Sequence, residues 1–280
     1  MDDDSQTVVS ASWLHTHHAD VRILDASWHM PAANRDARDE YMAVHIPGAM
    51  FFDIDAISDR ASTLPHMLPN PETFADEVGA LGISNDDQVV VYDSTGLFSA
   101  ARAWWMLRAM GHTRVAVLNG GLPAWTQLGG DVTNHRENPS PKTFKADLSG
   151  GAVTSLDQMR GISRTASRTI LDARPAGRFT GSQPEPRPGL PSGHMPNALS
   201  LPFTDVLTAD GYLKPVAALK DTFAELGVTE RTEVVTTCGS GVTAAILSLA
   251  LKRIGVQETS LYDGSWTEWG SREDCPIETG

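Results

Sequence analysis

One cysteine stands between an apolar, β-branched run and an apolar helical pattern, in the segment Thr237-Cys238-Gly-Ser-Gly-Val-Thr243. A cysteine at a strand-to-helix turn faces loop N–H groups and the positive end of a helix dipole, which favour thiolate over thiol. The same setting holds an anion, because two glycines let several N–H groups point at one place. Cys238 is therefore a candidate nucleophile. Its supporting loop consists of Gly239, Ser240, Gly241, Val242 and Thr243.

A second candidate group is the arginine pair Arg178 and Arg187, in a Gly/Pro-rich stretch over 174–187. This stretch follows the apolar run ending at Asp172, so it begins at the carboxyl end of a strand, on the side where Cys238 is expected. Forked guanidinium groups suit a substrate carboxylate, with about 1.5–3 kcal/mol for each charge-assisted hydrogen bond. The alternative is that these are surface arginines that balance Glu185 and its acidic neighbours.

The elements that position these groups occur twice along the chain. Four patterns of the first half return in the same order at an offset of about 145 residues. They pair Asp25 with Asp172, His45 with His194, Asp93 with Cys238, and Gly120 with Gly264. Four ordered matches at a nearly constant offset indicate an internal duplication.

In each half, short apolar runs alternate with helical patterns. Proline or glycine marks the ends of the four helices expected over 71–81, 99–110, 215–226 and 242–254. This alternation predicts an α/β fold of two tandem domains, each an open, mainly parallel sheet with helices on both faces. A polar, proline-bearing stretch separates the halves. We expect a non-catalytic N-terminal domain over 1–135, a linker over 136–150 and a catalytic C-terminal domain over 151–280.

Composition narrows the class of protein. The 280 residues are 41% hydrophobic, enough for two cores, and no apolar run approaches the ~20 residues of a membrane span. The acidic N-terminus lacks the pattern of a signal peptide. A net charge of −13 argues against nucleic acid and anionic membranes as partners. Two cysteines in unlike contexts are no disulfide framework, so a cytoplasmic location is expected.

The duplication serves as an internal control, because features found in one half alone are candidates for chemistry. Asp93 occupies the position of Cys238 in the first half and cannot act as a thiolate nucleophile. Catalysis is therefore expected only in the second half, with the first half shaping and closing the site. His45 and His194 occupy equivalent turns, which favours a shared role in positioning a loop. His45 remains a candidate contributor from the first domain, together with Asp36.

Several long segments resemble the two-domain sulfurtransferases, the rhodanese and mercaptopyruvate sulfurtransferase family. They are the loop over 238–244, the segment His45-Ile-Pro-Gly-Ala-Met-Phe-Phe-Asp-Ile-Asp55, Trp104-Trp105 with Asn119-Gly-Gly121, and Tyr262-Asp-Gly-Ser-Trp266. The resemblance covers essentially the whole chain. It implies two similar α/β domains and a persulfide carried by the C-terminal cysteine. The chemistry calls for no metal and no organic cofactor.

Within this family the loop separates two classes of sulfur donor. Thiosulfate enzymes resemble Cys-Arg-Lys-Gly-Val-Thr, whereas Gly239 and Ser240 are neutral, as in the mercaptopyruvate enzymes. The resemblance also implies that Arg178 and Arg187 hold the donor's carboxylate and keto oxygen. It places an aspartate and a histidine of the first domain near the site, and these would be Asp36 and His45.

The expected reaction moves sulfane sulfur from 3-mercaptopyruvate through a Cys238 persulfide to an acceptor, releasing pyruvate. The acceptor would be cyanide, a small thiol or a thioredoxin-type protein. Thiosulfate sulfurtransferase is the main alternative, because the family's substrates overlap. A cysteine phosphatase would need an arginine where this loop has Thr243 and Ala244, and a non-enzymatic rhodanese-like module usually lacks the cysteine. Cys275, with acidic neighbours and no glycine loop, is expected to be incidental.

Overall fold

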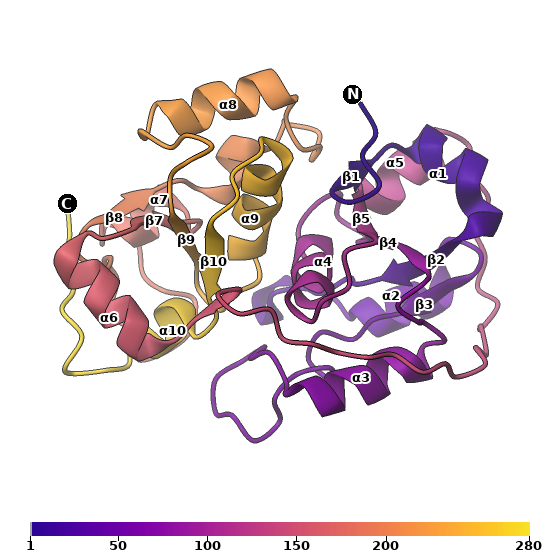
Figure 1. Ribbon diagram of the computed structural model, residues 1–280, viewed down its shortest axis with the longest axis horizontal. Coiled ribbons are helices and arrows are strands. Elements are labelled where there is room, and N and C mark those ends of the chain that lie inside the picture. The colour runs from indigo at the N-terminus through magenta and orange to yellow at the C-terminus, as the bar shows by residue number, and fades with distance from the viewer. Residues whose placement is uncertain (1) are drawn as a thin grey trace. The chain divides into compact units, whose positions relative to one another are not determined.

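The computed structural model describes residues 2–280, which divide into two compact units. The first unit takes in the residues up to 60, 68–149 and 209–213, and the second takes in 61–67, 150–208 and 214–280. Each unit contains one five-stranded sheet with its own helices (Figure 1). All strand pairs in both sheets are parallel. The predicted fold class is confirmed.

The first sheet has the strand order β1-β5-β4-β2-β3. The elements of this unit are, in chain order, β1 (Val8–Val9), α1 (Ala11–His17), β2 (Val21–Asp25), α2 (Ala37–Ala43), β3 (Ala49–Phe51), α3 (Pro71–Ala80), β4 (Gln88–Tyr92), α4 (Ala100–Ala109), β5 (Val115–Leu118) and α5 (Gly121–Gln127), with short 3-10 turns at His18–Asp20 and Pro31–Ala33.

The second sheet repeats this topology as β6-β10-β9-β7-β8. Its unit contains β6 (Val153–Thr154), α6 (Leu156–Thr165), β7 (Thr169–Asp172), α7 (Ala176–Phe179), β8 (Ala198–Ser200), α8 (Val216–Ala224), β9 (Val234–Thr237), α9 (Ala244–Arg253), β10 (Thr259–Tyr262) and α10 (Ser265–Trp269), with a 3-10 turn at Phe203–Val206. The equal strand orders support the internal duplication. Among residues 2–280, no helix is both long and apolar enough to cross a bilayer.

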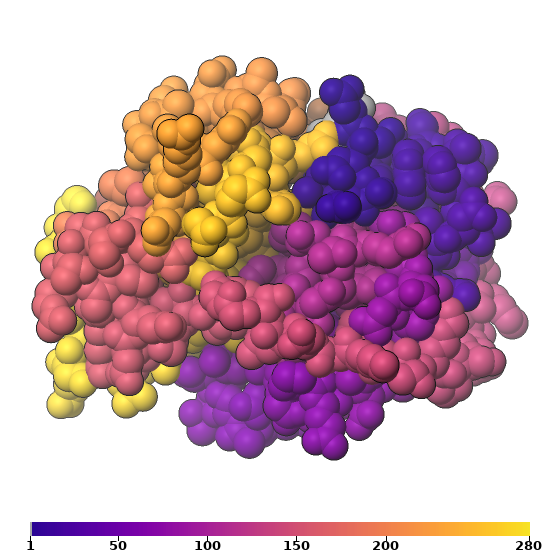
Figure 2. Space-filling view, viewed as in Figure 1, coloured from indigo at the N-terminus to yellow at the C-terminus, as the bar shows by residue number. Residues whose placement is uncertain are grey.

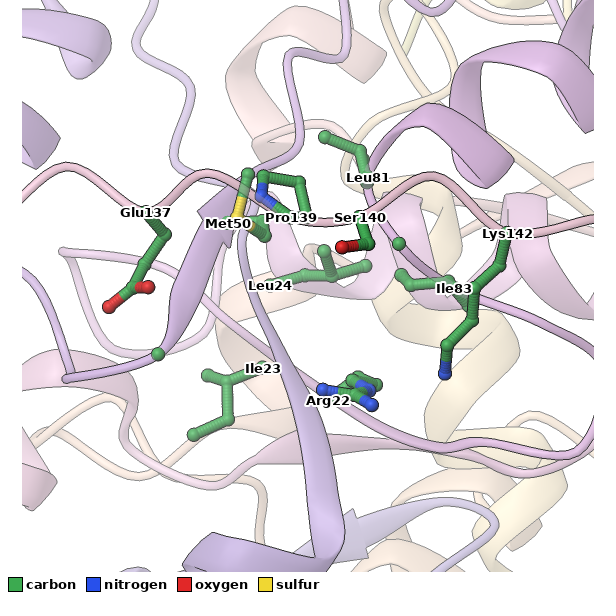
Figure 3. Close-up of a pocket in the computed structure, with 12 residues that line it drawn as sticks. Arg22, Ile23, Leu24, Met50, Leu81, Ile83, Glu137, Pro139, Ser140 and Lys142 are labelled. Carbon is green, nitrogen blue, oxygen red and sulfur yellow. The ribbon is translucent and has the colours of Figure 1, made fainter.

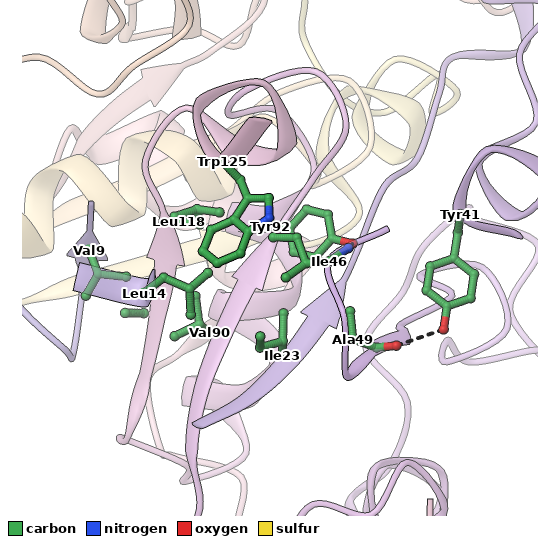
Figure 4. Packing of buried hydrophobic residues seen from close by; sticks show 11 residues of the cluster. Val9, Leu14, Ile23, Tyr41, Ile46, Ala49, Val90, Tyr92, Leu118 and Trp125 are labelled. Atoms are coloured by element: carbon green, nitrogen blue, oxygen red, sulfur yellow. Dashed lines mark hydrogen bonds between the residues drawn. The ribbon is translucent and has the colours of Figure 1, made fainter. Parts of the chain in front are cut away.

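Buried β-branched residues explain the central strands. Residues 89–91 of β4 are fully buried, although neighbours along a strand point to opposite faces. Both faces of the sheet are therefore covered, as expected for parallel strands between helices. Burial of each valine side chain contributes roughly 1.5–3 kcal/mol. Figure 4 shows part of this core, in which Trp125 packs with Tyr92 and Val90, and Tyr41 Oη donates to the Ala49 carbonyl at 2.8 Å.

Proline and asparagine place the helix starts near the predicted positions. α3 has Pro71 in its first turn, and the side chain of Asn70 caps it. In α8, by contrast, Pro215 is the N-cap rather than a residue of the first turn. α9 begins at Ala244, two residues later than predicted, because the turn leaving Cys238 takes more of the chain.

Most of the predicted linker packs against the first unit. Residues 139–149, which we call the strap, lie along the first unit, and Figure 2 shows them as a pink band over its magenta and purple atoms. The Lys142 N–H donates to the Gly79 carbonyl at 2.9 Å, and Lys142 Nζ lies 2.8 Å from Asp87 Oδ2. Phe144 is buried against Phe74. The strap is therefore part of the first unit's packing.

Candidate active site

The cysteine loop connects the end of β9 to the start of α9. Cys238 is the first residue after β9 and is only 2% exposed. The chain reverses at Gly241, whose φ is +79°. Residues 244–251 of α9 are buried inside the unit. The helix begins directly after the loop, so the positive end of its dipole faces the loop. This is the strand-to-helix turn that the sequence predicts.

The start of α10 holds the back of this loop. The N–H of Trp266 donates to the Cys238 carbonyl at 2.9 Å, and Thr267 donates to the Gly239 carbonyl from its N–H at 2.9 Å and its hydroxyl at 2.6 Å. The Cys238 N–H in turn donates to Ser265 Oγ at 3.3 Å. The loop is thus held by backbone hydrogen bonds from a neighbouring element, which limits its freedom around the thiol.

Ser265 is not among the residues predicted from the sequence to form the site. It has φ +48°, in the left-handed region that costs a non-glycine residue about 1–3 kcal/mol. The equivalent residue of the first unit is Gly121, with φ +54°. The half that carries the cysteine therefore bears this strain together with a hydroxyl that bonds the Cys238 N–H. The replacement of glycine by serine between the repeats is the signal that could have identified it.

Both predicted arginines lie beside the cysteine loop. Arg178 is on the short helix α7, in a stretch that the sequence analysis treated as loop. A Cβ added at Gly239 would lie 3.0 Å from Arg178 Nη2 and 3.9 Å from Arg187 Nη1. Arg187 Nη2 donates to Ser240 Oγ at 3.3 Å. Two forked guanidinium groups therefore converge on a loop that has no charged side chain of its own.

Arg178 is paired with Glu185, the partner that the alternative interpretation named, but not at the surface as that interpretation expected. Its Nε donates to Glu185 Oε1 at 3.1 Å, and its Nη2 donates to Glu185 Oε2. The Glu185 side chain is 2% exposed, so this is a buried ion pair rather than a surface one. The pairing does not withdraw Arg178 from the loop, because the contact with Gly239 and the ion pair are present together.

A third arginine, Arg174, contacts the same Glu185 carboxylate as Arg178. It is not among the residues predicted from the sequence to form the site. Its side chain is fully buried and stacks over the Trp266 ring at 4.1 Å. Nε and Nη2 donate to the carboxylate of Asp172, and Nη1 donates to Glu185 Oε1 at 2.8 Å. Burial alone would lower the pKa of Arg174, but the charges and hydrogen bonds of Asp172 and Glu185 outweigh burial and raise that pKa.

The equivalent loop of the first unit encloses an anion of its own. Asp93 follows β4 as Cys238 follows β9, and its carboxylate is 1% exposed. Four backbone N–H groups donate to it at 2.7–3.0 Å, those of Thr95, Phe98, Ser99 and Ala100. A turn of this kind therefore directs several N–H groups at one negative charge, which is the property predicted for the cysteine loop.

His45 and Asp36 have structural contacts within the first unit. His45 is fully buried, with Nδ1 2.6 Å from the Tyr41 carbonyl and Nε2 3.1 Å from the His135 carbonyl. His194 likewise contacts the Phe179 carbonyl at 2.9 Å, which supports the shared role inferred from the repeat. Asp36 caps α2 through its side chain. The participation of Asp36 and His45 in chemistry stays a prediction.

A cavity of about 330 Å³ lies in the first unit, between the strap and the β2–β3 edge (Figure 3). Its walls include Leu24, Met50, Leu81 and Pro139, with Lys142 to one side. Its lining residues include no residue of the cysteine loop and none of Arg174, Arg178 and Arg187. Within residues 2–280, no three His, Cys, Asp or Glu side chains are grouped so as to hold a metal ion.

Comparison with known proteins finds the same architecture. A family model described as "Rhodanese-like domain" matches residues 10–128 and 153–272. The chain is 44% identical to 3-mercaptopyruvate sulfurtransferase of Escherichia coli (strain K12), over 96% of this chain and 97% of that protein. It is 43% identical to thiosulfate/3-mercaptopyruvate sulfurtransferase 1, mitochondrial, of Arabidopsis thaliana, over 98% of this chain and 79% of that protein. The crystal structure of SseA from Escherichia coli matches with a TM-score of 0.84 at 41% identity, over 92% and 98% of the two chains.

Proposed function

The chain belongs to the rhodanese-like family, with two tandem copies of the domain, and we propose that it transfers sulfur from 3-mercaptopyruvate to a thiol or cyanide acceptor. The observation that carries the proposal is the convergence of Arg178 and Arg187 on an uncharged cysteine loop. Two guanidinium groups suit a donor with a carboxylate and an adjacent keto oxygen. The names of the relatives point to the same donor.

In the first half-reaction, the Cys238 thiolate attacks the sulfur of 3-mercaptopyruvate. A sulfur–sulfur bond forms, and the carbon–sulfur bond breaks with its electron pair left on carbon. The thiol proton of the donor ends on that carbon, so the products are the Cys238 persulfide and pyruvate. The two sulfur atoms of the persulfide together lose the two electrons that the donor carbon gains, so no outside oxidant is needed.

The arginines and Ser240 act on the charge that develops on the donor. Arg178 and Arg187 hold the carboxylate and the keto oxygen, where the negative charge of the departing enolate accumulates. The Ser240 hydroxyl accepts from Arg187 at 3.3 Å, and we assign it the role of relaying the proton or polarising the sulfur. Because the guanidinium groups are positioned before the donor arrives, little reorganisation accompanies the bond change.

Loop N–H groups stabilise the sulfur anion before and after transfer. The first-unit loop directs four N–H groups at the Asp93 carboxylate. By the offset of the repeat, three of these positions correspond to Ser240, Thr243 and Ala244 of the second unit. We assign their N–H groups to the thiolate and then to the terminal persulfide sulfur, and Gly241 and Val242 complete the turn between them.

In the second half-reaction, an acceptor nucleophile attacks the outer sulfur of the persulfide. The Cys238 thiolate leaves, and a thiol acceptor becomes a persulfide while cyanide becomes thiocyanate. We propose a small thiol or a thioredoxin-type protein as the acceptor, with cyanide as a laboratory substitute. Cys238 and Cys275 are both free thiols. That state is compatible with a reducing compartment, and we propose the cytoplasm.

Thiosulfate sulfurtransfer is the second candidate function, because one of the relatives carries thiosulfate as well as 3-mercaptopyruvate in its name. The deciding experiment compares turnover on the two donors at matched concentrations, with cyanide as acceptor. We expect a higher kcat/KM for 3-mercaptopyruvate. A higher kcat/KM for thiosulfate would overturn the proposal that 3-mercaptopyruvate is the preferred donor.

The persulfide itself is tested by intact-protein mass spectrometry after exposure to the donor alone. We expect one additional sulfur atom, mapped to Cys238 by peptide analysis and absent from a folded Cys238→Ser variant. Cys275→Ala is the matched control, and it should still gain the sulfur at Cys238. Appreciable turnover by folded Cys238→Ser would overturn the assignment of the nucleophile.

A further inference from the structure

We propose that Glu185 is a positioning residue that orients Arg178 for the sulfur donor, anchored in turn by Arg174 and Asp172. The inference deepens the proposed function and rests on the donor-binding role given to Arg178 there. Neither Glu185 nor Arg174 was identified from the sequence as part of the site. Their contribution follows from four features of the second unit: burial, hydrogen-bond geometry, comparison between the repeats, and charge.

The first feature is the rigidity of the anchor. Asp172 ends β7 and is 1% exposed, and it accepts from Arg174 through both carboxylate oxygens. Arg174 Nη2 also donates to the Gly193 carbonyl at 2.7 Å, and its guanidinium lies over Trp266. Because each of these partners is buried, the orientation of Arg174 is held by contacts on several sides.

The second feature is the way Glu185 joins the two arginines. Glu185 Oε1 accepts from Arg174 Nη1 at 2.8 Å and from Arg178 Nε at 3.1 Å, and Oε2 accepts from Arg178 Nη2. The contact with Arg178 is bidentate, so it fixes the plane of that guanidinium as well as its position. Nη1 and the second hydrogen of Nη2 stay available for a ligand on the other side of Arg178.

The third feature is that the other half of the protein lacks the buried arginine of this cluster. It does have a bidentate pair of its own, in which Arg35 donates to both carboxylate oxygens of Glu40 beside Ser94, the counterpart of Gly239. At the end of the equivalent strand, Asp25 accepts from the N–H and hydroxyl of Ser27. Ser27 therefore occupies the place that Arg174 has in the second unit, at the same two-residue spacing from the aspartate. The fold forms its first sheet without a buried arginine here. The buried Arg174 is consequently a feature of the unit that carries the cysteine rather than a requirement of the fold, whereas an arginine–glutamate pair beside the loop occurs in both units.

The fourth feature is the charge of the cluster. Asp172 and Glu185 balance Arg174 and Arg178, so the four groups are formally neutral. Arg178 therefore contributes directed N–H groups to a donor more than net positive charge. Directed groups select a carboxylate with an adjacent keto oxygen, whereas undirected positive charge attracts any small anion equally. Glu185 is thus expected to favour an α-keto acid over an inorganic dianion.

The test is Glu185→Gln, which keeps the shape of the side chain and replaces one acceptor oxygen with an NH₂ group. We expect KM for 3-mercaptopyruvate to rise about 10- to 100-fold with kcat changed less than threefold, because orientation before the reaction is lost. KM for thiosulfate should stay the same or fall, because the cluster gains positive charge. Glu185→Asp, which keeps the charge, should recover part of the affinity for 3-mercaptopyruvate.

The matched control is Glu233→Gln, which removes an exposed carboxylate paired with Arg168 in the same unit. It should change neither donor's kinetics. A merely structural role for Glu185 predicts a lower melting temperature and equal losses on both donors, and that result would overturn the proposal. If Glu185→Gln does not fold, Glu185→Asp carries the same comparison, because its shorter reach must also raise KM for 3-mercaptopyruvate alone.

A double-mutant cycle separates this inference from the function on which it rests. If Glu185 acts through Arg178, Glu185→Gln should have no further effect on KM for 3-mercaptopyruvate in an Arg178→Ala background. Additive effects, with Arg178→Ala itself impaired, would overturn the positioning role and leave the proposed function intact. Unchanged use of 3-mercaptopyruvate by Arg178→Ala would instead overturn both.

Discussion

Gly239 and Arg178 depend on each other, because a Cβ added at Gly239 would lie only 3.0 Å from Arg178 Nη2. The φ angle of Gly239 is outside the left-handed region, so glycine is needed there for space rather than for conformation. The neutral loop residue Gly239 is therefore the one that leaves room for the guanidinium. Any side chain at 239 requires the Arg178 guanidinium to shift by a few tenths of an ångström.

Gly239→Ala should displace Arg178 and leave the loop backbone in place. We expect kcat/KM for 3-mercaptopyruvate to fall about tenfold, because a shift of a fraction of an ångström misaligns the donor, while use of thiosulfate changes little. Steady-state kinetics on both donors measures this. Gly161→Ala is the control, because its added Cβ meets nothing within 4 Å. Unaltered kinetics with 3-mercaptopyruvate would contradict the steric relationship.

Arg187→Ala should impair use of 3-mercaptopyruvate far more than use of thiosulfate. Loss of charge-assisted hydrogen bonds to the donor carboxylate costs about 1.5–3 kcal/mol, or roughly 10- to 100-fold in kcat/KM. The comparison uses both donors with cyanide as acceptor. Replacement of the exposed Arg164 of α6 by alanine controls for the general loss of one positive charge. Equal losses on both donors would argue against a carboxylate clamp.

Ser265→Gly should separate stability from activity. Relief of the left-handed conformation favours folding by about 1 kcal/mol, while loss of the hydroxyl removes the partner of the Cys238 N–H. We expect an equal or higher melting temperature and a kcat several-fold lower. Ser265→Ala, which keeps the strain but loses the hydroxyl, should be slow and also less stable. Full activity in both variants would show that this hydrogen bond does not affect the chemistry.

Asp93→Ala should destabilise the first unit by about 2–4 kcal/mol, because it leaves several buried N–H groups without their anion. Faster hydrogen exchange at the β4 and β5 amides measures this within one unit of a two-unit protein. Added sulfate should restore protection to the variant more than to the unmodified protein. Asp86→Ala, at an exposed position, is the control. Unchanged exchange in Asp93→Ala would contradict the role of the carboxylate.

The attachment of the strap should weaken in acid. Burial alone would raise the pKa of Asp87, but hydrogen bonds from Lys142 and Ser84 and the charge of Lys142 outweigh burial and hold that pKa well below 3.8. A lowered folded-state pKa means that the ionised carboxylate stabilises the fold above about pH 4, and this contribution is lost as pH falls further. Asp87→Asn should therefore be less stable than the unmodified protein at pH 7.

The measurement for Asp87 is the denaturation midpoint of both proteins from pH 7 down to pH 2. The gap between the two should narrow below about pH 4, because the Asp87 carboxyl group takes up a proton more readily in the unfolded chain than in the folded one. Lys142→Met should reduce the same gap at neutral pH, because Asp87 then has one partner fewer. A gap that stays constant across the range would rule out this ion pair as its cause.

Local pattern was enough to identify the duplication, the order of strands and helices, and the place of Cys238 between β9 and α9. These properties depend on residues close together in the chain: valine runs for buried strands, proline and glycine for helix ends, and glycines for the turn. The same is true of the arginine pair, because a strand end places the following stretch at one edge of a parallel sheet. Helix limits were less well predicted, as at Pro215 and Ala244, because the conformation of a helix-end residue also depends on contacts with residues distant in the sequence.

Tertiary structure alone decided which charged and strained groups serve the cysteine loop. Glu185 read as one of several acidic residues balancing arginines, and only burial and bidentate geometry distinguish it as a bridge between Arg174 and Arg178. Ser265 contacts Cys238 across 27 positions of the chain. From the sequence, Asp93 indicated only that the first half lacks a nucleophile. In the structure, its carboxylate accepts hydrogen bonds from the N–H groups of its own loop. Such relationships depend on side-chain rotamers and packing between distant segments, which no local spacing of residues encodes.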